Sequence, residues 1–256
     1  MSKRKRFIIT SILLSLGFVS IQLFDNQFRF WYIGILSLLT AILFFWSLYE
    51  GLAKDMTLLT LVLPTMFTAG VGIFWFLLPS NFFARIPVTI FYGLGVYALC
   101  LTMNIYSVAA IRTIALLRAA RGVGFVLTLL TSFLVFDAIL SLKTSFWMTS
   151  LLLSILSFPI YLQGYWSIPL DKKASREIVY ISIISSLAIG EIALCLFFWP
   201  VTVVGGSLFL TIAVYILLGL GQVKLEQRLF PQTVREYLLV GVLVFIGMFI
   251  ATRWGG

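Results

Sequence analysis

Residues 177–200, EIVYISIISSLAIGEIALCLFFWP, decide the fold, because this apolar run is long enough to cross a membrane as a helix. The run carries a carboxyl group, Glu191, just past its midpoint. A carboxyl group at that depth is costly, so it is usually protonated, paired with another group or turned toward a water-lined cavity. Glu191 is therefore the first candidate for a functional residue.

The composition extends this interpretation to the whole chain. Hydrophobic residues make up 61% of the 256 residues and charged residues 11%, and a soluble fold of this size could not bury so much apolar surface. The apolar runs are continuous, which predicts helices and not the alternating strands of a barrel. We expect an all-α, polytopic integral membrane protein, a bundle of nine transmembrane helices in a single transmembrane domain over residues 1–256, without an extramembrane domain. The predicted spans are about 7–24, 31–49, 56–78, 88–110, 123–142, 146–165, 178–199, 201–220 and 237–252.

The positions of the basic residues predict the orientation. Of the 18 Lys and Arg residues, only four fall in connections on the side away from the N-terminus: Arg29, Arg85, Lys143 and Arg253. Positive charge gathers on the cytoplasmic side, so we expect a cytoplasmic N-terminus and an outside C-terminus, in a bacterial-type plasma membrane. The basic residues are interpreted as anchors to anionic lipid headgroups on the cytoplasmic side, and no nucleic acid is expected as a partner.

Local signals predict where helices bend or end. Pro64 and Pro159 lie inside apolar spans, where proline removes a backbone hydrogen bond, so bends are expected there. Because Gly70 and Gly72 follow Pro64, a close packing face is the alternative in that span. Gly122 and Gly124 permit a break between the basic end of the fourth helical stretch and the fifth span. Aromatic residues near span ends are assigned to the headgroup belt, among them Trp31, Tyr49, Tyr161, Tyr165 and Trp166.

Glu191 borders a face of small residues on its own helix. Ser182, Ser186 and Gly190 repeat every four residues, which favours close contact with another helix. Glu191 lies ~100° around the helix from Gly190, at the edge of that contact. Two interpretations stay open: a protonatable site on an ion or solute path, or a neutral carboxyl group hydrogen-bonded to a neighbouring helix or paired with an arginine.

The remaining candidates are weaker. Asp137 lies nearer the outer end of the fifth span, which favours an interfacial carboxylate that reaches water or Lys143, unless Asp137 faces Glu191. Asn104 is expected to make an interhelical hydrogen bond. The basic cluster is expected mainly to set the orientation, with binding of a phosphate or anionic lipid headgroup as the alternative; it consists of Arg112, Arg118 and Arg121.

Catalytic signatures are missing from the sequence. It has no histidine, which excludes triads with a histidine base, and Cys100 and Cys195 lie in apolar runs without CxxC spacing. No metal ligand set or cofactor is expected, and an enzyme would have to rely on an Asp/Glu dyad.

Two functional hypotheses follow. The first is a small-solute or ion carrier in which Glu191, with or without Asp137, exchanges protons or binds a cation while helices bent at Pro64 and Pro159 move. The second is a non-catalytic structural or assembly subunit of a membrane complex, whose polar groups satisfy one another or the helices of a partner. The expected partners are membrane lipids and either another membrane protein or further copies of this chain.

The orientation can be tested directly. A reporter that is active only outside the cytosol, fused after Gly256, is expected to be active, because nine spans place the two termini on opposite sides. A silent reporter on a chain that inserts normally would contradict this prediction.

Overall fold

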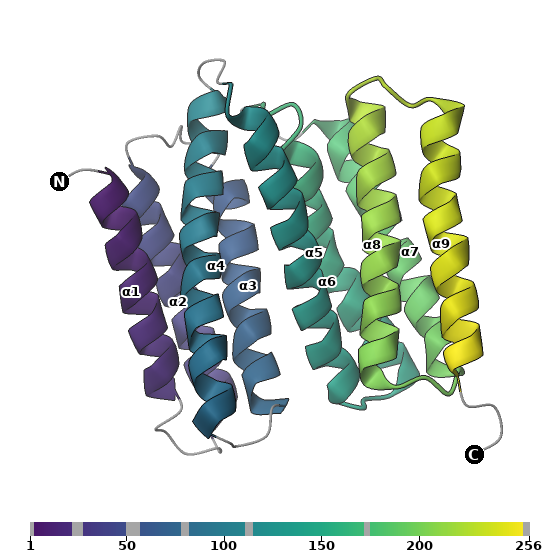
Figure 1. Ribbon diagram of the computed structural model, residues 1–256, viewed down its shortest axis with the longest axis horizontal. Coiled ribbons are helices and arrows are strands. Elements are labelled where there is room, and N and C mark those ends of the chain that lie inside the picture. The colour runs from purple at the N-terminus through teal and green to yellow at the C-terminus, as the bar shows by residue number, and fades with distance from the viewer. Residues whose placement is uncertain are drawn as a thin grey trace. The chain divides into compact units, whose positions relative to one another are not determined.

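A computed structural model describes residues 3–21, 28–49, 57–77, 82–110, 115–171 and 175–252 (Figure 1). Within these ranges the chain forms nine α-helices and no strand, which confirms the all-α prediction. In chain order they are α1 (Lys3–Ile21), α2 (Arg29–Leu48), α3 (Thr57–Leu77), α4 (Phe82–Ala109), α5 (Leu117–Ser141), α6 (Phe146–Trp166), α7 (Arg176–Phe197), α8 (Val203–Leu225) and α9 (Pro231–Ala251).

Eight of the nine helices, α2 to α9, are long and apolar enough to cross a membrane. The polytopic transmembrane fold is therefore confirmed. Helix α1 is also present, but the charges of Lys3, Arg4, Lys5 and Arg6 in its first turns keep it outside that set. That α1 crosses the membrane, and that the N-terminus is cytoplasmic, stay predictions.

The chain divides into two compact units. Unit 1 is Met1–Thr131 with Leu170–Lys173, and unit 2 is Ser132–Pro169 with Ala174–Gly256. In unit 1, helices α1 to α4 pack on one another. In its core, the ring of Phe18 stacks on Tyr92 with centroids 4.8 Å apart, and the Tyr92 hydroxyl lies 3.1 Å from Thr68 Oγ1.

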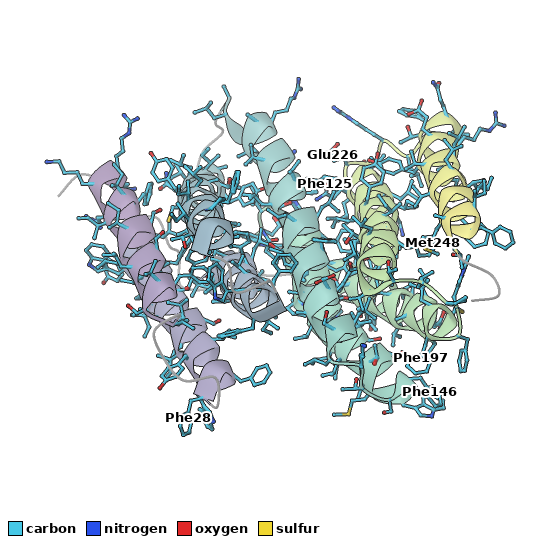
Figure 2. All side chains as sticks on the ribbon, turned by 60° about the horizontal axis from the view of Figure 1, so that its bottom comes forward. Phe28, Phe125, Phe146, Phe197, Glu226 and Met248 are labelled. Carbon is cyan, nitrogen blue, oxygen red and sulfur yellow. The ribbon has the colours of Figure 1, made fainter. Side chains whose placement is uncertain are left out.

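Unit 2 is built on the pair α6 and α7. Phe146, at the start of α6, and Phe197, at the end of α7, have ring centroids 5.8 Å apart, so the two helices run antiparallel (Figure 2). Between one and two turns in from that end of the pair, Ser150 Oγ donates a hydrogen bond to the carbonyl of Gly190 (2.8 Å). Helix α8 packs against both, and α9 packs against α8 with none of its own residues buried.

The small-residue face predicted on α7 is confirmed. Ser182, Ser186 and Gly190 are all buried. A Cβ added at Gly190 would collide with Ser154 Oγ and lie 3.2 Å from the carbonyl oxygen of Ser150. The missing side chain therefore lets α6 and α7 approach closely enough for the Ser150 hydrogen bond to form.

The expected break at Gly122 and Gly124 is wrong, because α5 begins at Leu117 and continues through both glycines. Gly124 serves packing instead: a Cβ there would collide with the hydroxyl of Tyr106, which donates to the carbonyl of Ala120 (3.2 Å). The bends expected at Pro64 and Pro159 stay predictions. Helices α3 and α6 continue through these prolines.

The assignment of three aromatic residues to the headgroup belt is also wrong. Tyr161, Tyr165 and Trp166 are completely buried in unit 2, whereas Trp31 is 74% exposed, as a belt residue should be. Tyr165 fits inside because Gly221 presents no side chain to its ring. The Tyr165 hydroxyl then lies 2.8 Å from Ser185 Oγ and donates to the carbonyl of Leu217 (3.0 Å).

The contact between α6 and α7 predicts a difference between two glycines. Gly190→Leu should destabilise the protein by about 1–3 kcal/mol, because the new side chain must push the helices apart. Gly247→Leu on α9 is the matched control, since a Cβ at Gly247 meets nothing within 4 Å. Thermal unfolding in detergent micelles measures both variants. Equal midpoints would contradict the assigned role of Gly190.

Candidate functional site

The carboxyl group of Asp137 lies inside unit 2, between α5 and α8. Its side chain is 4% exposed, and Ser207 Oγ donates a hydrogen bond to Asp137 Oδ1 (3.3 Å). The interfacial interpretation of Asp137 is therefore wrong, because a side chain so deeply covered does not reach bulk water. Glu191 does not share this site, because its side chain is exposed.

Small residues at the start of α8 precede the serine that contacts this carboxyl group. Thr202 caps the helix, accepting a hydrogen bond from the backbone N–H of Gly205 (3.1 Å). Gly206 follows, and a Cβ on it would lie 3.3 Å from Leu140 Cδ1 of α5. Gly206 thus lies against the side chain of Leu140, and the next residue, Ser207, lies within hydrogen-bond distance of Asp137.

Ser207 can serve two protonation states of Asp137. Its hydroxyl has one proton and two acceptors within reach: Asp137 Oδ1 at 3.3 Å and the carbonyl of Val204 at 3.0 Å. An ionised Asp137 can accept the proton of Ser207. A protonated Asp137 can instead donate to Ser207 Oγ, which then donates to Val204. Binding or release of one proton thus changes the hydrogen bonding between α5 and α8 without leaving either group unpaired.

A cavity of about 150 Å³ opens one helical turn from Asp137, at the end of unit 2 where α7 connects to α8. Leu140, which follows Asp137 by three residues on α5, and Gly206, which precedes Ser207, both line it. Thr149, Trp199 and Thr202 contribute its polar groups, and each of them already has a hydrogen-bond partner within the protein. Asp137 and Ser207 themselves do not line this cavity, which lies beside them.

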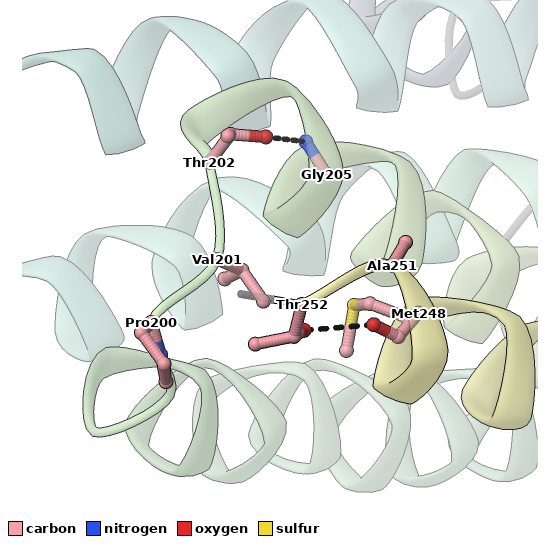
Figure 3. A pocket seen from close by; sticks show the side chains of 7 residues that line it. All are labelled: Pro200, Val201, Thr202, Gly205, Met248, Ala251 and Thr252. Atoms are coloured by element: carbon pink, nitrogen blue, oxygen red, sulfur yellow. Dashed lines mark hydrogen bonds between the residues drawn. The ribbon is translucent and has the colours of Figure 1, made fainter. Parts of the chain in front are cut away.

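A second cavity, of about 300 Å³, lies where the α7–α8 connection meets the end of α9 (Figure 3). Its polar side chains already have partners within the protein. Thr202 caps α8, and Thr252 Oγ1 donates to the carbonyl of Met248 (2.7 Å) and accepts from Trp199 Nε1 (3.0 Å). This cavity consequently offers a ligand few polar groups that are not already engaged.

Glu191 occupies the outward side of α7. Its side chain is exposed, and in the described part of the chain no hydrogen bond or ion pair to it is found. It lines neither of the two cavities at the α7–α8 end. The structure thus separates the two candidate carboxyl groups: Asp137 is covered by its own chain, and Glu191 faces away from it.

The other candidates are placed as follows. Asn104 is half-buried on α4, where its backbone carbonyl accepts a hydrogen bond from Ser107 Oγ (3.0 Å). Arg118 is exposed and Arg121 half-exposed in the first turns of α5, whereas Arg112 lies outside the described residues. Lipid or phosphate binding by this cluster stays a prediction.

Sequence reasoning missed Ser207, although a signal for it was present. The segment Thr202–Ser207, TVVGGS, places a capping threonine before two glycines and a serine at the start of an apolar span. Such a run of small residues favours close approach of another helix. It did not reveal that the approaching helix would be the one carrying Asp137.

These features define the class of the chain as a polytopic helical membrane protein with a buried carboxyl group in one of its two units. In the described ranges, no three His, Cys, Asp or Glu side chains gather as metal ligands would. The chain belongs to the DUF5656 family, which is described as a protein of unknown function and which matches residues 16–251. Neither the curated proteins nor the solved structures contain a match to it.

The pairing of Asp137 with Ser207 predicts energetic coupling between them. Asp137→Ala and Ser207→Ala should each lower the free energy of unfolding, but the double variant should lose less than the sum, with a coupling of about 0.5–3 kcal/mol. Thermal or denaturant unfolding in detergent measures this cycle.

A matched cycle uses Ser157→Ala in place of Ser207→Ala. Ser157 is equally buried in unit 2, but its hydroxyl donates to the carbonyl of Leu153 in its own helix (2.6 Å). Its effect should simply add to that of Asp137→Ala. Additive effects in both cycles would show that the Asp137–Ser207 hydrogen bond contributes no stability.

Proposed function

We propose that this protein is a membrane carrier for a small solute or ion, in which Asp137 is the group that binds and releases a proton or a cation. The observation that carries the proposal is the buried Asp137 carboxyl group, hydrogen-bonded by Ser207 and one helical turn from a cavity. Ionisable groups enclosed within transmembrane helices commonly mark ion and proton pathways. The role that the sequence favoured for Glu191 passes in this proposal to Asp137.

The two hydrogen-bonding states of Ser207 supply a mechanism. With Asp137 ionised, the Ser207 proton joins α8 to α5; with Asp137 protonated, that proton turns to Val204 within α8. The first turn of α8 also lines the cavity through Val203 and Gly206. A change in protonation therefore acts on the helix end that borders the cavity. A ligand that binds one of these states more tightly shifts the population between them.

The second candidate is a non-catalytic subunit of a membrane complex, and Glu191 favours it. A carboxyl group on an outward apolar helix face is costly to leave in lipid, whereas a partner helix can hydrogen-bond to it. On this view Asp137 holds α5 against α8 and takes no part in transport. The two candidates differ in what removal of the Asp137 charge does to proton movement.

Proteoliposomes loaded with a pH-sensitive dye can distinguish the candidates. The wild-type protein should carry protons inward when an inside-negative potential is imposed, in the presence of at least one member of a panel of small solutes and monovalent cations. Asp137→Asn should abolish this signal, because the amide cannot take up the proton. Ser207→Ala should reduce it, because one protonation state then lacks its partner.

Glu177→Gln is the matched control. Glu177 is an exposed carboxylate in the first turn of α7, and its loss should leave proton uptake unchanged. Unchanged uptake by folded Asp137→Asn protein would refute the carrier. No uptake by the wild type across the whole panel, with destabilisation by Asp137→Asn, would instead support the subunit.

A further inference from the structure

One face of α7 is turned away from the rest of the protein. Its exposed residues follow one another at intervals of three or four, which places them in a single stripe along the helix. We call this stripe the α7 outer face: it consists of Tyr180, Ile184, Leu187, Glu191 and Cys195. The face is largely apolar. Its one carboxyl group, that of Glu191, lies between Leu187 and Cys195, toward the C-terminal end of α7.

The position of Glu191 in the helix puts its carboxyl group within the hydrocarbon. Helix α7 ends at Phe197, about 9 Å further along at ~1.5 Å per residue, whereas the hydrocarbon half-thickness is about 15 Å. The Cα–Cβ bonds of a helix point toward its N-terminus, so the side chain inclines toward the middle of the membrane. Glu191 is therefore poorly placed to reach the nearer headgroup layer.

Lipid tails offer no hydrogen bond to this group, and the described part of the chain supplies none either. A carboxylic acid group carries one donor and free acceptor sites, so two of them can satisfy each other. A two-fold symmetric interface places the same surface of each copy against the other and brings a residue at its centre next to itself. A second copy of this chain thus supplies the hydrogen-bond partner that Glu191 lacks, and no other kind of molecule is needed.

We propose that the α7 outer face binds the same face of a second copy of the chain, with the two Glu191 carboxyl groups hydrogen-bonded to each other. The small-residue face of α7 is already occupied by α6, through Gly190 and Ser150, which leaves the outer face for an external partner. The dimer is independent of the carrier, because it uses none of the residues around Asp137.

The exposed face of α9 provides a contrast. It is also apolar and uncovered, with residues such as Leu239, Val242 and Ile246. From Tyr237 to Ala251 it has no charged residue, so lipid tails can cover it at no electrostatic cost. Lack of a partner is thus a problem for the α7 outer face but not for α9, and this difference supplies a control surface.

Cys195 provides a built-in probe of the proposed interface. It lies one turn beyond Glu191 on the same face, whereas the other cysteine, Cys100, is fully buried. Copper–phenanthroline oxidation, or a short bis-maleimide, should cross-link the full-length protein in native membranes to a product of twice its mass. The product should persist in Cys100→Ser and disappear in Cys195→Ser. Cys195→Ser/Val242→Cys, which moves the thiol to α9, should give no comparable product.

Variants of Glu191 test the hydrogen bond itself. Energy transfer between two fluorescent proteins fused after Gly256, measured over increasing detergent dilution, gives the strength of self-association. Glu191→Leu should weaken it about tenfold, because the interhelical hydrogen bonds are lost. Glu191→Gln should retain most of it, since an amide also both donates and accepts.

Three results would overturn the proposal. The first is a monomer that resists cross-linking at Cys195, and the second is a dimer as strong in Glu191→Leu as in the wild type. The third is a Cys195 product whose mass is not twice that of the chain, which would identify a different membrane protein as the occupant. None of these results bears on proton uptake through Asp137.

Discussion

The interior of a membrane contains no water to satisfy polar groups, and this constraint governs both units of the protein. Helices meet it for the backbone. Many hydroxyl side chains meet it by bonding to their own helix: Ser182 donates to the carbonyl of Ile178 (2.7 Å), and Thr131 to that of Leu127 (2.7 Å). A carboxyl group has no such local solution, so Asp137 and Glu191 must find partners on other elements or other molecules.

The two carboxyl groups differ in how the free-energy cost of placing a carboxyl group inside a membrane is reduced. Asp137 is covered by its own chain, and Ser207 of α8 provides a hydroxyl within hydrogen-bond distance of it. Glu191 lies on a helix whose small-residue face is already filled by α6, which turns the glutamate outward. An inward group suits a reaction within the fold, such as proton binding. An outward group suits recognition of another molecule.

Close packing in this protein depends on positions where a side chain is missing. Gly190 admits Ser150 and Ser154 of α6, Gly221 admits the ring of Tyr165, and Gly124 admits the hydroxyl of Tyr106. In each case a polar atom of the neighbour makes a hydrogen bond nearby, so the glycine allows both the contact and the satisfaction of a buried polar group. Leucine-rich surfaces alone could not provide this, since lipid tails compete equally well for apolar contacts.

The sequence by itself determined the helices. The length and continuity of an apolar run are local properties, and the thickness of the bilayer fixes how long a run must be to cross it as a helix. It also determined the small-residue face of α7, since a four-residue repeat defines one side of a helix. Tertiary structure alone decided which helix each face meets. It brought Ser207 to Asp137 across a sequence separation of 70 residues, buried Tyr165 against Gly221, and left Glu191 outside. The periodicity of one helix carries no information about the neighbour that will cover it, and the partner of a buried charge depends on that neighbour.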